Sequence, residues 1–213
     1  MNFSHLARLA IIVAGGLALM LLVAGVDLLT DPVFYLLSAA MLAWSLAEAF
    51  ALKQGEPADY AAKRNTRMLQ AAVVLAALVG GADHWRLHWT ALPSWFVPIG
   101  LVVILLGGAL RVWSIRTLDA HFRYELRVEA GQKIVDQGPY RLVRHPSYLG
   151  LLVLTIGEGL ALASPLGALV GGVAVVSMLV LRIRAEERVM RASFGAAYDA
   201  YARGTWKLVP YVY

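Results

Sequence analysis

The sequence contains no cysteine and few charged residues. Without cysteine, a disulfide framework, a thiolate metal site and a cysteine nucleophile are all excluded. Charged residues make up only 15% of the 213 residues, whereas a soluble domain carries about 25%. Hydrophobic residues reach 60%, with a mean hydropathy of +0.65. A chain of this length cannot bury so much apolar surface in its own core, so we expect part of it to face lipid.

Six apolar segments approach the length of a membrane-crossing helix, roughly 17–25 residues. They cover residues 6–29, 33–52, 68–83, 95–113, 148–163 and 166–181. The third is the weakest because it contains Gln70 and ends in two glycines. Only Ser164 and Pro165 separate the last two, which predicts the turn of a tight helical hairpin. The pattern predicts an all-α, polytopic transmembrane helix bundle of about six spans.

The basic residues indicate the orientation of these spans. If the N-terminus is cytoplasmic, the inner segments hold 18 of the 19 lysines and arginines, and only Arg86 lies outside. This is the positive-inside pattern of a multi-pass protein, so the net charge of +5 does not indicate nucleic acid as a partner. The first apolar run is too long for a signal peptide and no clear cleavage site follows it. We therefore expect an integral membrane protein of an inner (plasma) membrane, with both termini cytoplasmic and membrane lipids as partners.

Two polar segments flank the predicted hairpin, at residues 111–147 and 182–213. Because the hairpin returns the chain to the side from which it started, both segments are expected at the same membrane face. This is the one place where the sequence predicts that polar groups converge into a site.

The first polar segment ends in Gly-Pro-Tyr-Arg-Leu-Val-Arg-His-Pro-Ser-Tyr-Leu-Gly at residues 138–150. Gly138 and Pro139 are typical of a turn, and Pro146 fits the first position of a helix, where its missing N–H costs nothing. His145 is thus expected where irregular backbone becomes the fifth span. Irregular backbone at a membrane surface is tolerated where it lines a cavity, and its amides and carbonyls can hold the adenine and ribose of a cofactor.

The second polar segment begins with Arg-Ile-Arg-Ala-Glu-Glu at residues 182–187. Arg182 and Glu186 are four residues apart, so they share one face of a helix. Arg182 also lies at the end of an apolar span, where an ionisable group is costly and is a functional candidate by default.

These two motifs, with Phe-Gly-x-x-Tyr-x-x-Tyr at residues 194–201, resemble the isoprenylcysteine carboxyl methyltransferase family, to which phospholipid methyltransferases are related. The resemblance covers about residues 111–210, and the first three spans carry no motif. It implies an integral membrane enzyme that moves a methyl group from S-adenosylmethionine to a membrane-accessible lipophilic acceptor. It also implies two regions, an N-terminal transmembrane region at 1–110, whose fourth span runs to about 113, and a catalytic methyltransferase region at 111–213.

The resemblance further implies a role for each matching residue. Arg182 corresponds to an arginine placed at the substrate and is the catalytic candidate, whereas no metal ligand is expected. Glu186 would pair with the α-ammonium of the cofactor, and Arg182 would hold an acceptor carboxylate by a bidentate fork. The cofactor-binding candidates are Gln132, Lys133, Ile134, Val135, Tyr140, His145, Pro146, Ser147, Tyr148 and Glu186.

The acceptor stays open at this point. A carboxylate is already ionised at neutral pH and needs no general base, which slightly favours it over the amine of a phospholipid N-methyltransferase or a thiol. A second alternative is a membrane reductase that resembles the sterol reductases and uses NADPH, although the Arg-His-Pro motif argues against it. A non-enzymatic membrane module would leave the polar motifs unexplained.

Several further polar residues are not counted among the site residues. Glu187 is expected only to pair with arginines of its own helix. Glu158, in the fifth span, either lines the substrate cavity or is a neutral structural acid. His84 and His88, beside two tryptophans, are interpreted as loop residues in an aromatic belt. Four arginines are expected to face anionic headgroups, namely Arg123, Arg127, Arg141 and Arg144.

Overall fold

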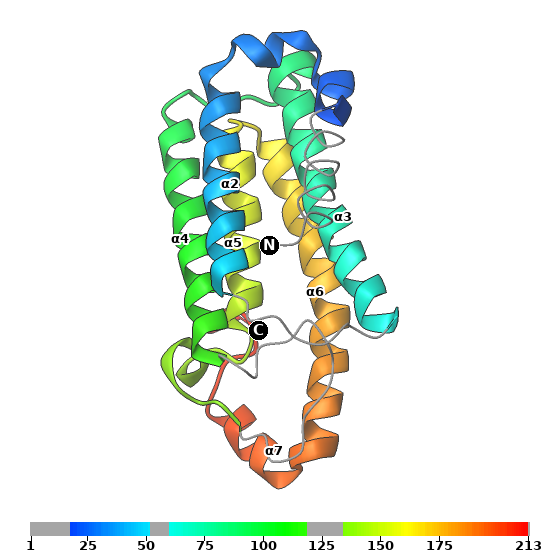
Figure 1. Ribbon diagram of the computed structural model, residues 1–213, viewed down its shortest axis with the longest axis vertical. Coiled ribbons are helices and arrows are strands. Elements are labelled where there is room, and N and C mark those ends of the chain that lie inside the picture. The colour runs from blue at the N-terminus through cyan, green and yellow to red at the C-terminus, as the bar shows by residue number, and fades with distance from the viewer. Residues whose placement is uncertain (1–17, 52–59, 119–133, 213) are drawn as a thin grey trace.

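A computed structural model describes residues 18–51, 60–118 and 134–212 of the chain. Their regular secondary structure is helical, as predicted, and the long helices lie side by side as a bundle (Figure 1). After a helical stretch at residues 18–24, the order is η1 (Val26–Thr30), α2 (Pro32–Ala51), α3 (Tyr60–Ala82), the π-helical turn η2 (Asp83–Leu87), α4 (Phe96–Leu118), η4 (Gly138–Arg141), α5 (Pro146–Ala161), α6 (Pro165–Phe194) and α7 (Ala196–Arg203).

Two of these helices, α4 and α6, are long and apolar enough to cross a bilayer. Shorter apolar helices cover Pro32–Trp44 and Pro146–Ala161. Much of the first expected span lies outside the described residues, so the count of about six spans stays a prediction. Helix α6 continues well beyond the predicted apolar run and ends at Phe194, because the polar residues that follow the run are good helix formers.

The predicted helical hairpin is confirmed. Pro146 and Pro165 are the first residues of α5 and α6, where a proline loses no helical hydrogen bond. Ser164 caps α6, since its Oγ accepts a 2.9 Å hydrogen bond from the amide of Gly167. The two helices are therefore antiparallel neighbours, and the start of α5 lies beside residues 182–187 of α6, which continues past it to Phe194 (Figure 1).

Helices α4 and α5 approach each other through glycines. A methyl group on Gly107 would lie 2.6 Å from the amide nitrogen of Leu154, and one on Gly150 would lie 2.6 Å from the carbonyl oxygen of Gly107. Those distances are too short for any side chain, so the close packing requires glycine at both positions. As a result the last turns of α4 lie against the first turn of α5.

At the end of the bundle where the hairpin turns, a carboxylate is enclosed by donors. Asp83 is fully buried; its Oδ1 accepts from the amides of Trp89 and Thr90 at 3.0 Å. Its Oδ2 accepts from the hydroxyls of Thr90 and Ser164 at 2.5 Å. Burial opposes ionisation, but these hydrogen bonds outweigh it and hold the pKa of Asp83 below its usual value. We call these four residues the Asp83 network.

His84, which was interpreted as a loop residue, also has a structural partner at this end. His84 Nε2 lies 3.0 Å from Asp31 Oδ2, and Trp85 Nε1 donates to the same oxygen at 2.9 Å. These contacts tie the turn after α3 to the start of α2.

Candidate functional site

The two polar segments meet at the other end of the bundle, as the sequence predicts. After α7 the chain turns back, and its C-terminal segment (residues 204–212) pairs with the strip that precedes α5 (residues 142–145). The amides of Arg144 and His145 donate to the carbonyls of Trp206 and Lys207 at 2.8 and 3.2 Å. Leu208 packs into the apolar cluster that contains Leu152 of α5 and Ile183 of α6. The C-terminal segment is therefore anchored between both helices of the hairpin.

Tyr148 links the two principal motifs. Arg182 Nε donates to the Tyr148 hydroxyl at 2.6 Å, and that hydroxyl donates to Glu186 Oε2 at 2.9 Å. The Tyr148 ring stacks on the imidazole of His145, with centroids 5.6 Å apart and planes 10° apart. Four residues predicted from the motifs are thus in contact with one another.

His145 lies between two adjacent carboxylates of α6. Its Nδ1 is 3.7 Å from Glu186 Oε2, and its Nε2 is 3.6 Å from Glu187 Oε1. It occupies the N-cap position of α5, but its side chain makes no capping hydrogen bond. The imidazole is 6% exposed, and Nε2 has no hydrogen-bond partner among the residues that the structure describes. Its contacts are therefore with the acidic pair and Tyr148 rather than with the helix amides.

The structure corrects the interpretation of Glu187, which was expected to pair only with arginines of its own helix. Its side chain is 4% exposed, and Oε1 accepts from Arg144 Nε at 3.0 Å. Oε2 lies 3.5 Å from Arg191 and 3.9 Å from Lys207. Two of these cations come from other segments, which the sequence alone did not place beside α6. We call His145, Tyr148, Arg182, Glu186 and Glu187 the His145 cluster.

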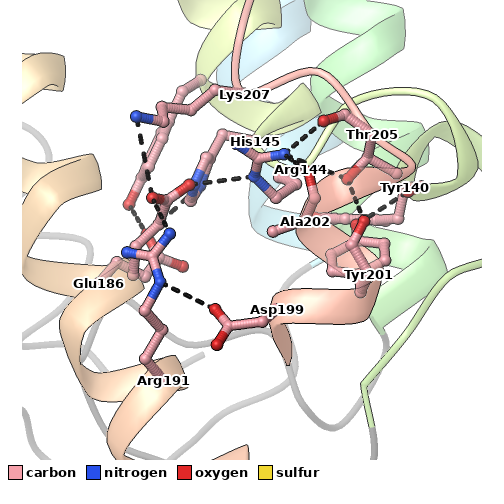
Figure 2. A network of polar contacts seen from close by, with 12 residues as sticks. Tyr140, Arg144, His145, Glu186, Arg191, Asp199, Tyr201, Ala202, Thr205 and Lys207 are labelled. Atoms are coloured by element: carbon pink, nitrogen blue, oxygen red, sulfur yellow. Dashed lines mark hydrogen bonds and ion pairs between the residues drawn. The ribbon is translucent and has the colours of Figure 1, made fainter. Parts of the chain in front are cut away.

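Arg144 was expected to face headgroups, and this expectation is wrong. Its guanidinium is 9% exposed and donates to Glu187. It also donates to the carbonyls of Ala202, at 2.7 Å, and Thr205 (Figure 2). A buried charge is tolerated only when paired and hydrogen-bonded. Arg144 therefore fastens the strip, α6 and the C-terminal segment together. Arg141 is exposed, whereas Arg123 and Arg127 lie outside the described residues.

Arg111 makes a further contact that was not predicted from the sequence. This residue of α4 is buried, and its guanidinium donates to Ser147 Oγ at 2.9 Å and to the Ser147 carbonyl at 3.3 Å. A basic residue within the last turns of an apolar helix was the available signal, because a buried arginine needs a partner. Ser147 and the buried Pro146 thus define where α5 starts relative to α4.

Tyr140 lies in η4, and its carbonyl accepts a 2.8 Å hydrogen bond from the Tyr201 hydroxyl of α7 (Figure 2). Burial, with the negative charge of Glu186, raises the pKa of Tyr140 above its usual value, so it remains a neutral hydroxyl. Ile134 and Val135 are half-buried in the segment that precedes η4. Gln132 and Lys133 lie outside the described residues, so the role of these four stays a prediction.

Comparison with known proteins confirms the resemblance. Residues 99–192 match the model of the isoprenylcysteine carboxyl methyltransferase (ICMT) family. Over 127 residues the chain is 35% identical to protein-S-isoprenylcysteine O-methyltransferase B of Arabidopsis thaliana, covering 59% of this chain and 62% of that protein. A probable protein-S-isoprenylcysteine O-methyltransferase of Oryza sativa subsp. indica is 31% identical over 121 residues, covering 55% of this chain and 63% of that protein. The chain thus spans less than two thirds of the length of these relatives.

The fold is also shared with a solved structure. The eukaryotic intramembrane Ras methyltransferase ICMT superimposes with a TM-score of 0.60 at 22% identity, covering 92% of this chain and 73% of that one. The similarity in architecture therefore extends well beyond the motifs, into the helices that carry none.

Proposed function

We propose that this chain is an integral membrane methyltransferase that moves a methyl group from S-adenosylmethionine to a carboxylate on a lipophilic acceptor. The observation that supports it most is the hydrogen-bonded series from Arg182 through the Tyr148 hydroxyl to Glu186. It holds a cation suited to an acceptor carboxylate beside an anion suited to the α-ammonium of the cofactor.

The residues at this end fit the cofactor. One carboxylate oxygen of Glu186 accepts a hydrogen bond from Tyr148, and the side chain is 36% exposed. Glu186 can therefore still bind an ammonium group. His145 offers a buried Nε2 that has no hydrogen-bond partner in the described part of the chain, and the Tyr148 ring offers a flat apolar face. Tyr140 adds a neutral hydroxyl. Gln132, Lys133, Ile134 and Val135 would lie along the cofactor, while Pro146 and Ser147 support the backbone.

When bound, S-adenosylmethionine supplies an electrophilic methyl group on a sulfonium sulfur. The sulfur leaves readily, as a neutral thioether. The chain's residues then have to position the acceptor and exclude water. Tyr148 orients Arg182 through its 2.6 Å hydrogen bond, so the guanidinium can present a fixed fork to a carboxylate. No proton has to be removed from an acceptor that is already ionised. A lipophilic acceptor would reach the site laterally from the bilayer.

Arg182 also discriminates between acceptors. Its positive charge would attract a carboxylate and repel the ammonium of a phospholipid amine. A phospholipid N-methyltransferase or a thiol methyltransferase is therefore the second candidate, and an NADPH-dependent reductase the third.

Binding of the cofactor tests the proposal first. Detergent-solubilised protein would be titrated calorimetrically with S-adenosylmethionine, and in parallel with NADPH. We expect saturable binding of S-adenosylmethionine alone, weakened about 30-fold in Glu186→Ala because a charge-assisted contact of roughly 2 kcal/mol is lost. His145→Ala should also weaken binding, whereas the exposed Arg203→Ala serves as a matched control. Binding of NADPH alone, or of neither ligand, would reject the methyltransferase.

Transfer of a labelled methyl group then tests the acceptor. The substrates would be an S-prenylated cysteine with a free carboxylate, its carboxamide, phosphatidylethanolamine and a long-chain thiol. We expect label on the free carboxylate only. Label on the amine or the thiol would keep the cofactor and replace the acceptor.

A further inference from the structure

A hollow of about 370 Å³ lies between α6 and the C-terminal segment. Its lining has four cationic side chains and one carboxylate, a formal charge of +3. They are Arg184, Arg188, Arg191, Lys207 and Glu187. Such a lining is suited to an anion, and neither the methyl donor nor the acceptor proposed above uses it.

The cationic excess comes mainly from Arg184 and Arg188. Both are exposed, and neither forms an ion pair with a carboxylate in the described part of the chain. Arg188 Nε instead donates to the carbonyl of Arg184 at 3.4 Å. Arg191 and Lys207, by contrast, lie near Glu187, and Arg191 also contacts Asp199 at 3.2 Å. Two arginines four residues apart repel each other on a helix, and an external anion would relieve this repulsion.

The hollow lies where the apolar surface of α6 ends. Leu181 is 60% exposed, and Arg184 follows it by about 4.5 Å along the helix axis. The C-terminal segment supplies Lys207 to the lining, and on the same segment Trp206 and Tyr211 are exposed, with their rings 5.1 Å apart. Tryptophan and tyrosine typically lie at the headgroup level of a bilayer, and the headgroup layer is roughly 5–8 Å thick on each side. The cations are therefore at the depth of lipid phosphates.

We propose that this hollow binds the phosphate group of an anionic membrane lipid, with Arg184 and Arg188 as its principal ligands. Arginine forks match phosphate oxygens bidentately. Glu187 is shared by the hollow and the His145 cluster, and its Oε1 is held by Arg144. The proposal requires only that the chain lies in a membrane, and it is independent of methyl transfer.

Native mass spectrometry of the full chain in detergent provides the test. The protein would be titrated with phosphatidylglycerol, with phosphatidylcholine and with inorganic phosphate. The variant Arg184→Gln/Arg188→Gln would be compared with Arg141→Gln/Arg203→Gln, which removes the same charge from exposed positions outside the hollow. We expect phosphatidylglycerol to bind in preference to phosphatidylcholine. Its affinity should fall about 10- to 30-fold in the first variant, since each basic residue near an anionic lipid contributes roughly fivefold, and far less in the second.

The outcomes separate the sources of phosphate. Equal binding of the two lipids, or equal loss in both variants, would overturn the proposal. Saturable binding of inorganic phosphate, lost in the first variant and without any preference for phosphatidylglycerol, would replace the lipid with a soluble ligand. Circular dichroism and thermal unfolding of both variants confirm folding, and the single variant Arg184→Gln is used if the double variant unfolds. Binding of S-adenosylmethionine is measured separately, so failure of this proposal and of the methyltransferase are distinguishable.

Discussion

Both ends of the helix bundle contain buried polar side chains, but the two sets differ in how fully they are hydrogen-bonded. In the Asp83 network, both oxygens of one carboxylate accept two hydrogen bonds each, at 2.5 to 3.0 Å. In the His145 cluster, the imidazole lies 3.6 and 3.7 Å from its two carboxylates, and within residues 18–51, 60–118 and 134–212 its Nε2 has no hydrogen-bond partner.

This difference separates a structural network from a site that can take a ligand. A buried polar group without a partner costs free energy, so it persists where a ligand can offset that cost. The Asp83 network has no such deficit, and substitutions there should change stability. Substitutions in the His145 cluster should change binding and rate. Four predictions test this contrast, from the largest expected effect to the smallest.

Asp83→Ala should lower the free energy of unfolding by about 4 kcal/mol, because it leaves buried donors unpaired and removes the centre of a network. Thermal or denaturant unfolding in detergent measures this loss. The half-buried Asp31→Ala provides a control with a smaller expected effect. Unchanged stability in Asp83→Ala would end the contrast between the two ends.

Arg182→Lys should lower kcat/KM for the carboxylate acceptor by about 100-fold, roughly 2.7 kcal/mol, since lysine keeps the charge but loses the fork. We expect the affinity for S-adenosylmethionine and the thermal midpoint to stay close to those of the parent protein. Initial rates at varied acceptor concentration provide the measurement. An equal loss of cofactor affinity would instead place Arg182 at the cofactor.

Gly150→Ala should destabilise the chain by roughly 1–3 kcal/mol, the usual cost of forcing extra atoms into a packed contact. Although Gly150 belongs to the His145 motif, its neighbours are the backbone atoms of Gly107 and Arg111. Gly172→Ala is the matched control, because of the described residues only Ile156 would lie within 4 Å of its added methyl. A Gly150→Ala protein of unchanged stability but without cofactor binding would show that this glycine serves the ligand.

Lowering the pH should also weaken the Asp83 network, with a smaller loss of stability than in Asp83→Ala. The folded pKa of Asp83 is below its usual 3.8, so its stabilising contribution is complete above that value and is lost as the pH falls toward the folded pKa. In Asp83→Asn this part of the pH dependence should disappear. Unfolding measured from pH 6 downward, at about half-unit steps, compares the two proteins. Parallel stability curves would contradict the assignment.

Local patterns in the sequence were sufficient for the helices and for part of the site. Pro146, Ser164 and Pro165 marked helix starts, and the spacing of Arg182 and Glu186 placed them on one face. Glu187, Arg144 and Arg111 escaped prediction because their partners come from segments far away in the chain. Nothing local shows that residues after α7 fold back beside the strip before α5. The Asp83 network was missed for the same reason, since Thr90 and Ser164 flank different helices.

The pairing of the strip before α5 with the C-terminal segment also determines when the site can form. Its last contributors, Trp206 and Lys207, leave the ribosome after α4, α5 and α6. Helices α4 and α5 can associate earlier, since chains fold progressively during synthesis. A nascent chain that stops after α6 would thus hold the Tyr148 hydrogen bonds within reach but lack the partners that fasten Arg144. Emergence of Trp206 and Lys207 is therefore the event that closes the site, and a truncation before these residues would leave it open.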